Sequence, residues 1–152
     1  MSIASTPVLE ASLGTVMTHL IALEEKVHDD LHVYRWRPRV PDLPCLWNWI
    51  PDAPFEQRDT GRFRDNVTIT AQIGIRHSDV DEEMAALEEY ADAFRFLIDP
   101  ALHTIHPLGA KWAKRQTMRL LGVTFGEGEG AIPVLVIEFP ILVQLDRMIS
   151  PS

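Results

Sequence analysis

Cysteine is nearly absent from this chain of 152 residues, and long apolar runs and an excess of basic charge are missing altogether. The single cysteine, Cys45, excludes an internal disulfide and is typical of a reducing compartment. No apolar run approaches the roughly 20 residues that cross a membrane, and no signal-peptide pattern opens the chain. The net charge of −8 disfavours adhesion to nucleic acid or anionic lipid, because phosphate binding needs clustered lysine and arginine. We therefore expect a soluble protein made in the cytoplasm.

The composition is typical of one folded domain. The hydrophobic share of 46% excludes a largely disordered chain. A domain of this length buries about two-thirds of its unfolded surface without needing a disulfide or a metal. No internal repeat and no linker divides the sequence, so a single domain over residues 1–152 is expected, with stiff connections at several of its eleven prolines.

Between residues 66 and 98 the spacing of the apolar residues changes from two to about three and a half. The alternation over residues 66–76 predicts a strand with one apolar face and one wet face. After Asp79 the apolar positions lie three and four residues apart, which predicts a helix that stops at Pro100, with Ser78 as its N-cap. The apolar strand positions are Val67, Ile69, Ala71, Ile73 and Ile75, and the helical stripe comprises Met84, Leu87, Ala91, Phe94 and Ile98.

A second long helix is expected near the start of the chain. It begins at Pro7, with Ser5 or Thr6 as its cap, and an apolar stripe continues over more than six turns before regularity is lost around Asp29. The stripe comprises Leu9, Leu13, Val16, Leu20, Leu23, Val27 and Leu31, and the outer face carries Glu10, Glu24 and Lys26.

The remaining segments favour strands. A short edge strand is expected at Val33, followed by a strand over residues 45–50. We interpret residues 51–65 as a long polar loop and a candidate assembly arm, because a connection of that length is usually functional or mobile. Residues 103–113 are expected to be irregular.

Two β-prone runs, residues 117–125 and 131–145, flank a glycine-rich junction and predict a hairpin. Pro140 has no backbone N–H, so a bulge or an edge position is expected there. The predicted fold is therefore α+β: a mixed, mainly antiparallel sheet with two helices packed on one face and a long loop or hairpin arm.

No catalytic, cofactor or metal site is predicted. His28 and His32 have the spacing that places two imidazoles on one helical face, but a zinc site needs three or four convergent ligands. We interpret them, like His103 and His106, as structural. Cys45 lies in an apolar segment without an adjacent base, so it is expected to pack as a small hydrophobe. The acidic residues from 79 to 83 lack the pattern of a calcium loop, and no helix follows the glycine run to form a phosphate site.

Two groups of arginines, in residues 35–39 and 58–64, lie beside aromatic residues in an otherwise acidic chain. Arginine and tryptophan are enriched at protein interfaces. Basic residues interleaved with aromatics also bind single-stranded nucleic acid, but the negative net charge favours subunit contacts. The candidate contact residues are Trp47, Trp49, Phe55, Arg58, Arg62, Phe63, Arg64, Glu127 and Glu129.

In its order of elements, the chain resembles the tail terminator family of long-tailed bacteriophages, also called tail completion or head-to-tail joining proteins. The resemblance spans nearly the whole chain. It rests on the long first helix, the tryptophan-containing segment 45–50 with the polar loop after it, the strand 66–76 that runs into a helix, and the closing hairpin around residues 126–130. It concerns layout, so no functional side chain carries over.

The resemblance implies a structural virion protein of the neck region, assembled in the host cytoplasm, and no enzyme. Six subunits would form a ring on the last ring of tail tube protein, stop tube growth and offer a joining surface to a head-completion or stopper protein. DNA would pass through the lumen without specific binding, and the acidic balance suits such passage. No cofactor and no membrane are implied.

Three alternatives stay open. Another neck or tail component, such as a stopper, connector or tube subunit, shares parts of this layout. A small metal- or ligand-binding enzyme would use His28, His32 and nearby acids. A single-strand binder would use the arginines and aromatics of the polar loop, and its affinity would depend strongly on salt.

Overall fold

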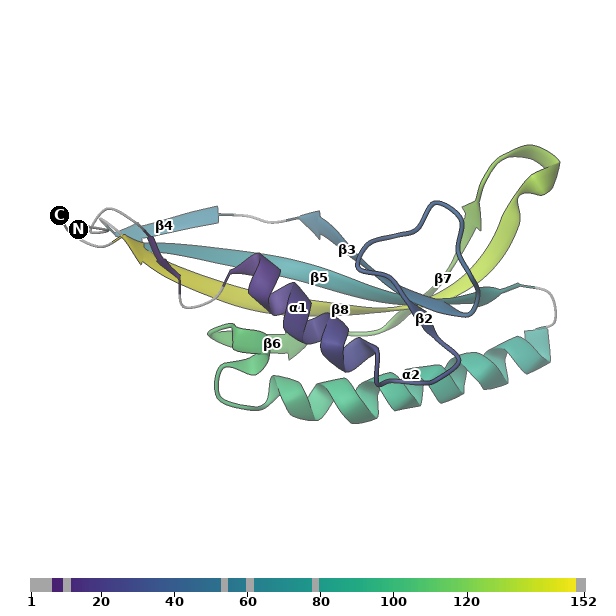
Figure 1. The fold of residues 1–152 in the computed structure, drawn as a ribbon, viewed down its shortest axis with the longest axis horizontal. Coiled ribbons are helices and arrows are strands. Elements are labelled where there is room, and N and C mark those ends of the chain that lie inside the picture. Colours follow the sequence, from purple (N-terminus) through teal and green to yellow (C-terminus); the bar gives the residue numbers. More distant parts are fainter. Residues whose placement is uncertain (1–6, 10–11, 53–54, 60–61, 78–79, 150–152) are drawn as a thin grey trace.

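Two long antiparallel strands, β5 (Arg62–Arg76) and β8 (Ile132–Ile149), form the centre of the computed structural model. The structure describes residues 7–9, 12–52, 55–59, 62–77 and 80–149. The register of the central pair is continuous from Arg62 opposite Met148 to Arg76 opposite Val134. The other strands surround this pair in one curled, eight-stranded sheet (Figure 1).

Strand β3 (Cys45–Asp52) pairs antiparallel with β5, and the edge strand β2 (His32–Val33) runs parallel to β3. Strand β4 (Phe55–Asp59) pairs with the first part of β5. Three short antiparallel strands follow one another along the other edge of β8, namely β7 (Arg119–Phe125), β6 (Trp112–Arg115) and β1 (Pro7–Leu9).

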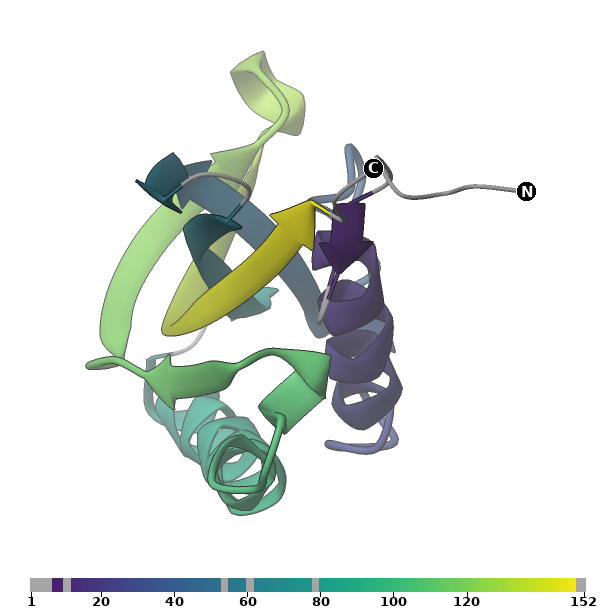
Figure 2. The same cartoon turned by 90° about the vertical axis from the view of Figure 1, so that its left-hand side faces the viewer.

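Two helices, α1 (Leu13–Glu24) and α2 (Val80–Leu102), cover one face of this sheet (Figures 1 and 2). Two short 3-10 helices, η1 (Pro107–Gly109) and η2 (Gly128–Gly130), lie in connections. The predicted α+β class is therefore confirmed, with a mixed, mainly antiparallel sheet and a one-sided helical layer.

The main core lies between the sheet and the helices. Alternate residues of β5, from Val67 to Ile75, are buried there as predicted, together with the apolar stripe of α2. The rings of Phe94 and Phe139 stack with centroids 4.2 Å apart and join α2 to β8. Burial of these side chains supplies most of the hydrophobic stabilisation, at about 25 cal/mol for each Å² of apolar surface.

The opposite face of β5 is not wet, contrary to the sequence expectation. Thr70 and Gln72 on that face are buried, because the sheet curls and the β2–β3 connection covers part of it. A second, smaller apolar cluster forms there from side chains of β3, β7 and β8. Its buried members are Cys45, Trp47, Phe125, Val134 and Val136.

Helix α1 is shorter than predicted. It begins after Ser12, whose Oγ accepts the N–H of Thr15 at 3.0 Å, and it ends at Glu24 after 12 residues. Residues Pro7–Leu9 pair with the end of β8 as a strand instead. The apolar spacing was misleading because Val27 and Leu31 are buried from the turns that follow the helix, not from the helix itself. The predicted caps Ser5 and Thr6 lie outside the described residues.

Helix α2 agrees with its predicted stripe but not with its predicted end. Pro100 lies inside the helix, which continues to Leu102 and closes with the N–H of His103 donating to the carbonyl of Pro100 at 3.2 Å. Proline has no N–H to donate to the carbonyl four residues earlier, so at this position it costs the helix one hydrogen bond close to its end. The predicted N-cap Ser78 lies outside the described residues.

The described residues between 51 and 65 form strands where a long loop was expected. Strand β3 continues to Asp52, and β4 pairs antiparallel with the beginning of β5, residues 62–65. We call this pair of strand segments the arm. Polar composition suggested a loop, but hydrogen bonding between strands does not require apolar side chains. The first residues of β6, from Trp112, likewise replace part of the irregular segment expected at 103–113.

Strand β8 passes through Pro140 without a bulge in its pairing with β5. The carbonyl of Pro140 accepts the N–H of Gln116 at 2.8 Å, so it faces the edge on which β6 and β7 lie. In an antiparallel strand the N–H and C=O of one residue face the same neighbour. The missing N–H of Pro140 therefore faces the gap between β7, which pairs up to Glu138, and β6, which pairs from Ile141. No ladder bond is lost.

Candidate assembly surfaces

The arm extends the sheet beyond the helical layer, at the end of the molecule where β1 pairs with the last residues of β8 (Figure 1). Strand β5 has 15 residues and spans about 50 Å, whereas the 23 residues of α2 span about 35 Å. Five of the predicted contact residues belong to the strands of the arm, although their side chains lie outside the described part of the structure. They are Phe55, Arg58, Arg62, Phe63 and Arg64.

The two tryptophans of β3 differ sharply in exposure. Trp47 is completely buried, in a T-shaped contact with Phe125 at 5.4 Å between ring centroids. It is a core residue and drops out of the candidate contact surface. Trp49, two residues further along the same face, is 51% exposed because the covering connection does not extend that far. Trp49 therefore remains available to a partner.

A chain of hydrogen bonds crosses the second face of the sheet through four neighbouring strands. Trp47 Nε1 donates to Gln72 Oε1 at 2.6 Å, and Gln72 Nε2 donates to Glu138 Oε2 at 2.8 Å. Arg119 completes the chain, with its Nε donating to Glu138 Oε1 at 2.6 Å. Because each buried polar group has a partner, the chain fixes the strand register at little cost.

The hairpin between β7 and β8 carries an exposed acidic tip. Glu127 and Glu129 lie there as predicted, and Gly126 and Gly128 take φ values of +83° and +66° that L side chains rarely adopt. Glycine is required at such positions because it has no Cβ to clash. The tip lies at the end of the molecule opposite the arm (Figure 1).

The two arginine groups do not gather, contrary to the sequence-based interpretation. Residues 35–40, which we call the basic loop, lie on the second face of the sheet beside β7 and the hairpin, whereas the arm lies at the other end (Figure 1). Arg37 holds its guanidinium carbon 4.4 Å from the centroid of the Phe125 ring. Trp36 and Val40 of the basic loop are 46% and 75% exposed. One continuous basic and aromatic patch is therefore absent from the described structure.

The outer surface of α2 is strongly acidic. Arg95 is the single basic residue of the helix and lies 3.9 Å from Asp92. Asp99 forms a two-pronged ion pair with Arg115, at 2.6 and 3.1 Å, which attaches β6 to the helix. The helix carries seven acidic residues against its one arginine, namely Glu83, which is buried, and Asp81, Glu82, Glu88, Glu89, Asp92 and Asp99.

An apolar groove of about 360 Å³ separates α2 from β7, and we call it the α2 groove. Leu120 of β7 is 52% exposed at this site. Strand β7 pairs only with β8 in the described sheet, so its outer edge is open. The groove is lined by the apolar residues Met84, Leu87, Ala91, Met118, Leu120 and Ile137 and by the charged residues Glu88, Asp92 and Arg95.

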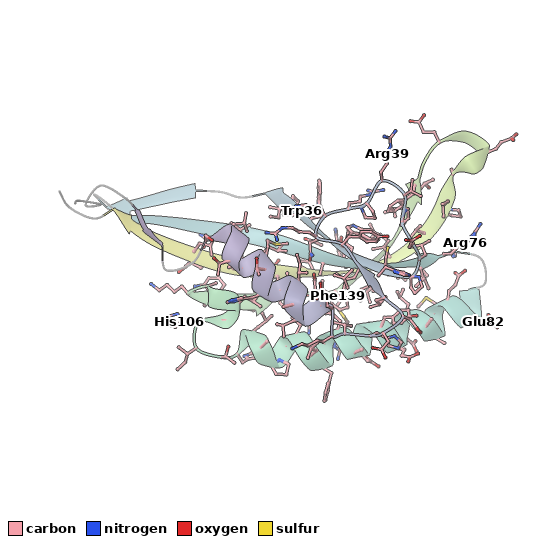
Figure 3. The ribbon with its side chains drawn as sticks, viewed as in Figure 1. Trp36, Arg39, Arg76, Glu82, His106 and Phe139 are labelled. Carbon is pink, nitrogen blue, oxygen red and sulfur yellow. The ribbon has the colours of Figure 1, made fainter. Side chains whose placement is uncertain are left out.

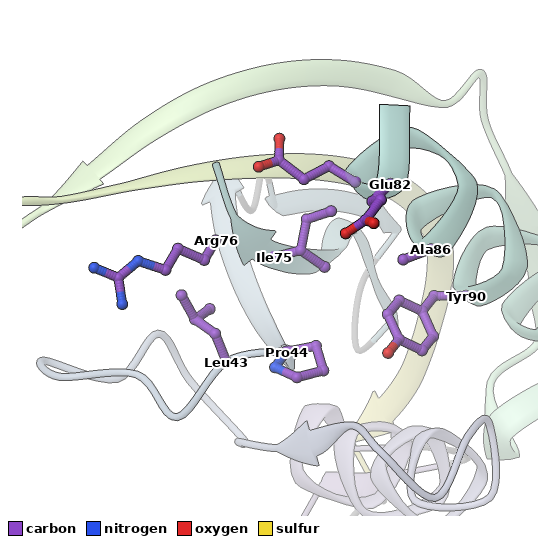
Figure 4. A pocket seen from close by; sticks show the side chains of 8 residues that line it. Leu43, Pro44, Ile75, Arg76, Glu82, Ala86 and Tyr90 are labelled. Atoms are coloured by element: carbon purple, nitrogen blue, oxygen red, sulfur yellow. The ribbon is translucent and has the colours of Figure 1, made fainter. Parts of the chain in front are cut away.

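A second cavity, of about 330 Å³, lies between the first turns of α2 and the connection before β3 (Figure 4). Arg76 stands on one side of it, and Glu82 and Tyr90 stand on others. Leu43 and Pro44 add an apolar wall. Charges of both signs around apolar walls favour peptide-like ligands over a single simple ion, and no group here is arranged as an activated nucleophile.

The two histidines considered as metal ligands belong to different segments, His28 to the connection after α1 and His32 to β2. His28 Nε2 lies 3.2 Å from Glu89 Oε1, and its ring packs edge-on against Tyr90. His32 belongs to β2 and lines a different cavity. No cluster of three or more potential metal ligands occurs among the described residues. Burial, with a smaller contribution from Asp42, raises the pKa of Cys45 to about 12, so its thiol is neutral near pH 7.

Glu24 is the buried acid that sequence reasoning placed wrongly, on the outer face of the first helix. It is fully buried, and Asn48 Nδ2 donates to its Oε1 at 2.7 Å. Burial raises the pKa of Glu24 to about 8, and the hydrogen bond from Asn48 opposes that rise. The sequence does contain one indication that Glu24 is buried: it lies four residues after Leu20, which places both residues on one helical face.

Comparison with known proteins gives no further constraint. Among the described residues, no helix combines the length and the apolar character needed to cross a membrane. The sequence matches no model of a known protein family, and no curated protein resembles it closely enough to count as a relative.

Proposed function

We propose that this protein is a tail terminator, the subunit of a ring that caps the tail tube of a long-tailed bacteriophage, stops its growth and provides the joining surface to the head connector. The proposal combines the layout of elements with the α+β fold. It assigns no chemical step to the protein, and its partners are further copies of the chain, the tail tube protein and a head-completion or stopper protein.

The observation that carries the proposal is an incompletely paired sheet with an arm. Beyond Leu46, no described strand pairs with the outer edge of β3, and β7 leaves the opposite edge open. Open edges and exposed aromatics such as Trp49 promote aggregation of an isolated subunit. Head-to-tail contacts that close a ring would cover both edges in every copy.

The direct test measures the mass of the purified protein by light scattering across concentration, with negative-stain imaging in the presence and absence of isolated phage tail tubes. A closed ring, or a monomer that caps tube ends, is the expected result. A monomer that ignores tubes would contradict the proposal and favour another neck component or a ligand-binding protein.

A variant pair sharpens this test. Replacing Arg58, Arg62 and Arg64 of the arm by alanine should leave the folded state intact and reduce ring formation or capping. Replacing Lys26, Arg76 and Lys114, three exposed cations outside the arm, removes the same charge and should not. Equal effects of both sets would show that only net charge matters and would remove the arm from the contact surface.

A further inference from the structure

Two surfaces of this molecule complement each other in charge and shape, although they lie on opposite faces of the sheet. One is the basic loop, residues 35–40, and the other is the α2 groove. Each surface is exposed in the single subunit, so the two do not contact each other within one copy.

The basic loop is built as a projecting, ordered structure. The N–H of Tyr34 donates to the carbonyl of Leu46 at 2.8 Å, and the N–H of Asp42 donates to the hydroxyl of Tyr34 at 3.1 Å, so both ends of the loop are attached. Pro41 is buried beside them. An element ordered before binding loses little conformational entropy when it docks.

The loop presents cations around an apolar anchor. Its three arginines, at 35, 37 and 39, are accompanied by no acidic residue between positions 35 and 40. Trp36 and Val40 project into solvent, and Figure 3 shows Trp36 and Arg39 on the side of the sheet away from α2. Tryptophan and arginine are the residues that most often dominate binding energy at interfaces.

The α2 groove offers the matching features. Its volume of about 360 Å³ accepts a large aromatic side chain, and its walls are mostly apolar. Glu88, Asp92 and Arg95 line it, so its charged residues are net acidic, and α2 as a whole is acidic. Arginines flanking an inserted tryptophan would meet carboxylates there, as electrostatic complementarity requires.

The opposite placement of the two surfaces determines the symmetry of the contact. Leu120 of the groove pairs in register with Ile137, which packs against the main core on the helical face. Arg37 of the loop covers Phe125 on the other face. A contact between two different surfaces is heterologous, so each copy keeps one surface free for the next copy.

We propose that the basic loop of one copy docks in the α2 groove of the next copy, with Trp36 inserted between α2 and β7 and the loop arginines facing Glu88 and Asp92. The contact joins copies head to tail. This inference rests on the proposed terminator function in one respect, namely that the chain of contacts closes into a ring. The contact itself can be measured without a tail.

Disulfide trapping tests the contact even when it is weak. Val40→Cys, which keeps the Trp36 anchor, and Leu120→Cys are made as separate full-length variants, mixed and oxidised, while Cys45 remains buried and does not interfere. We expect a cross-linked heterodimer from the mixture, little product from either variant alone, and a ladder of oligomers from the double variant. Salt at about 0.5 M should reduce the yield because it screens exposed charges.

The matched control replaces Ile105, which is 89% exposed outside the groove, by cysteine. A yield for Val40→Cys with Leu120→Cys no higher than for Val40→Cys with Ile105→Cys would overturn the proposal. A second result would also overturn it: no cross-link forms, and the protein binds a single-stranded oligonucleotide in a way that is lost when Arg35 and Arg39 are replaced. If the protein caps tubes but no cross-link forms, only this contact is rejected. If the cross-link forms but neither rings nor capping are seen, only the terminator function is rejected.

Discussion

At Gly74, a side chain of any other residue would have to occupy space that the second core cluster already fills. A Cβ there would lie 2.8 Å from Val134 Cγ1 and 2.9 Å from Trp47 Cζ3. Both neighbours are buried, so neither can move into solvent. The absence of a side chain at this strand position is therefore a packing requirement and not a requirement for unusual backbone angles.

We predict that Gly74→Ala lowers the free energy of unfolding by about 1–3 kcal/mol, the usual cost of overpacking a core. Gly122→Ala is the matched control, because a Cβ on this β7 residue meets nothing within 4 Å. The control should change stability by less than about 0.5 kcal/mol. Urea denaturation of both variants measures the difference, and equal stabilities would refute the packing argument.

Glu24 and Asn48 form the other residue-scale feature with a measurable consequence. Besides the hydrogen bond between them, Glu24 Oε2 and Asn48 Oδ1 are buried with no partner among the described residues. A proton on Glu24 supplies the donor that these oxygens lack. Burial is the main cause that shifts its pKa, and the hydrogen bond from Asn48 opposes that shift.

The pH dependence follows from the raised pKa of Glu24. The folded protein holds this proton up to about pH 8, whereas the unfolded chain releases it near pH 4.5. Stability from the neutral carboxyl is thus fully present below pH 4.5 and is lost as the pH rises through 8. Glu24→Gln stays neutral and keeps the same shape. Between pH 5 and pH 9, the native protein should lose a few kcal/mol of unfolding free energy relative to this variant, since a tenfold change in an equilibrium constant is about 1.4 kcal/mol.

Urea unfolding at several pH values measures this difference. Asn48→Ala serves as a companion variant, because it removes the hydrogen bond that opposes the pKa rise and should not abolish the pH dependence. Parallel pH profiles for the native protein and Glu24→Gln would show that Glu24 is ionised in the folded state and would contradict the prediction.

At the scale of elements, the start of α1 depends on one local hydrogen bond. Ser12 has the extended backbone of an N-cap, with φ −99° and ψ 157°, and its hydroxyl accepts the N–H of Thr15. The strand at Pro7–Leu9 pairs with β8 immediately before this cap. The chain therefore changes from sheet to helix within a few residues, and the cap fixes where the helix begins.

We predict that Ser12→Ala lowers the unfolding free energy by about 1 kcal/mol, the typical cost of losing an N-cap. Thr18→Ala removes another exposed hydroxyl from the same helix, one that donates to the carbonyl of Gly14 at 2.9 Å. That change should be neutral or slightly stabilising, because such back-bonding does not cap the helix. Thermal unfolding followed by circular dichroism compares the stabilities of the two variants. Equal losses of stability would show that Ser12 does not act as a stabilising N-cap.

At the scale of the whole molecule, strands β5 and β8 form a rigid axis between two protruding ends. The arm and the acidic tip lie at opposite ends, and the basic loop and the α2 groove lie on opposite faces. The register of this central pair is unbroken.

We predict that amide hydrogen exchange is slowest in the paired and buried parts of this axis, residues 67–75 and 134–143, and fastest at the tip, residues 126–130. Buried strands open only in rare unfolding events, whereas exposed turns open freely. Mass-spectrometric exchange on the purified protein measures this order. Fast exchange along β8 beyond Pro140 would show that the proline interrupts the strand after all.

The amino-acid sequence by itself determined the α+β class, the strand-to-helix switch around residues 66–98, the short edge strand, the strand from Cys45 and the closing hairpin. These features depend on local patterns of apolar spacing and glycine placement, which act whatever the rest of the chain does.

Only the tertiary structure decided the remaining features, because each depends on a partner distant in sequence. Strand pairing turned Pro7–Leu9 and the arm into strands, and the gap between β6 and β7 allowed Pro140 to stay in β8. Curling of the sheet buried Trp47 and the polar side of β5. Packing of α1 on β3 buried Glu24 beside Asn48. Burial is a property of the surroundings, and local sequence does not contain them.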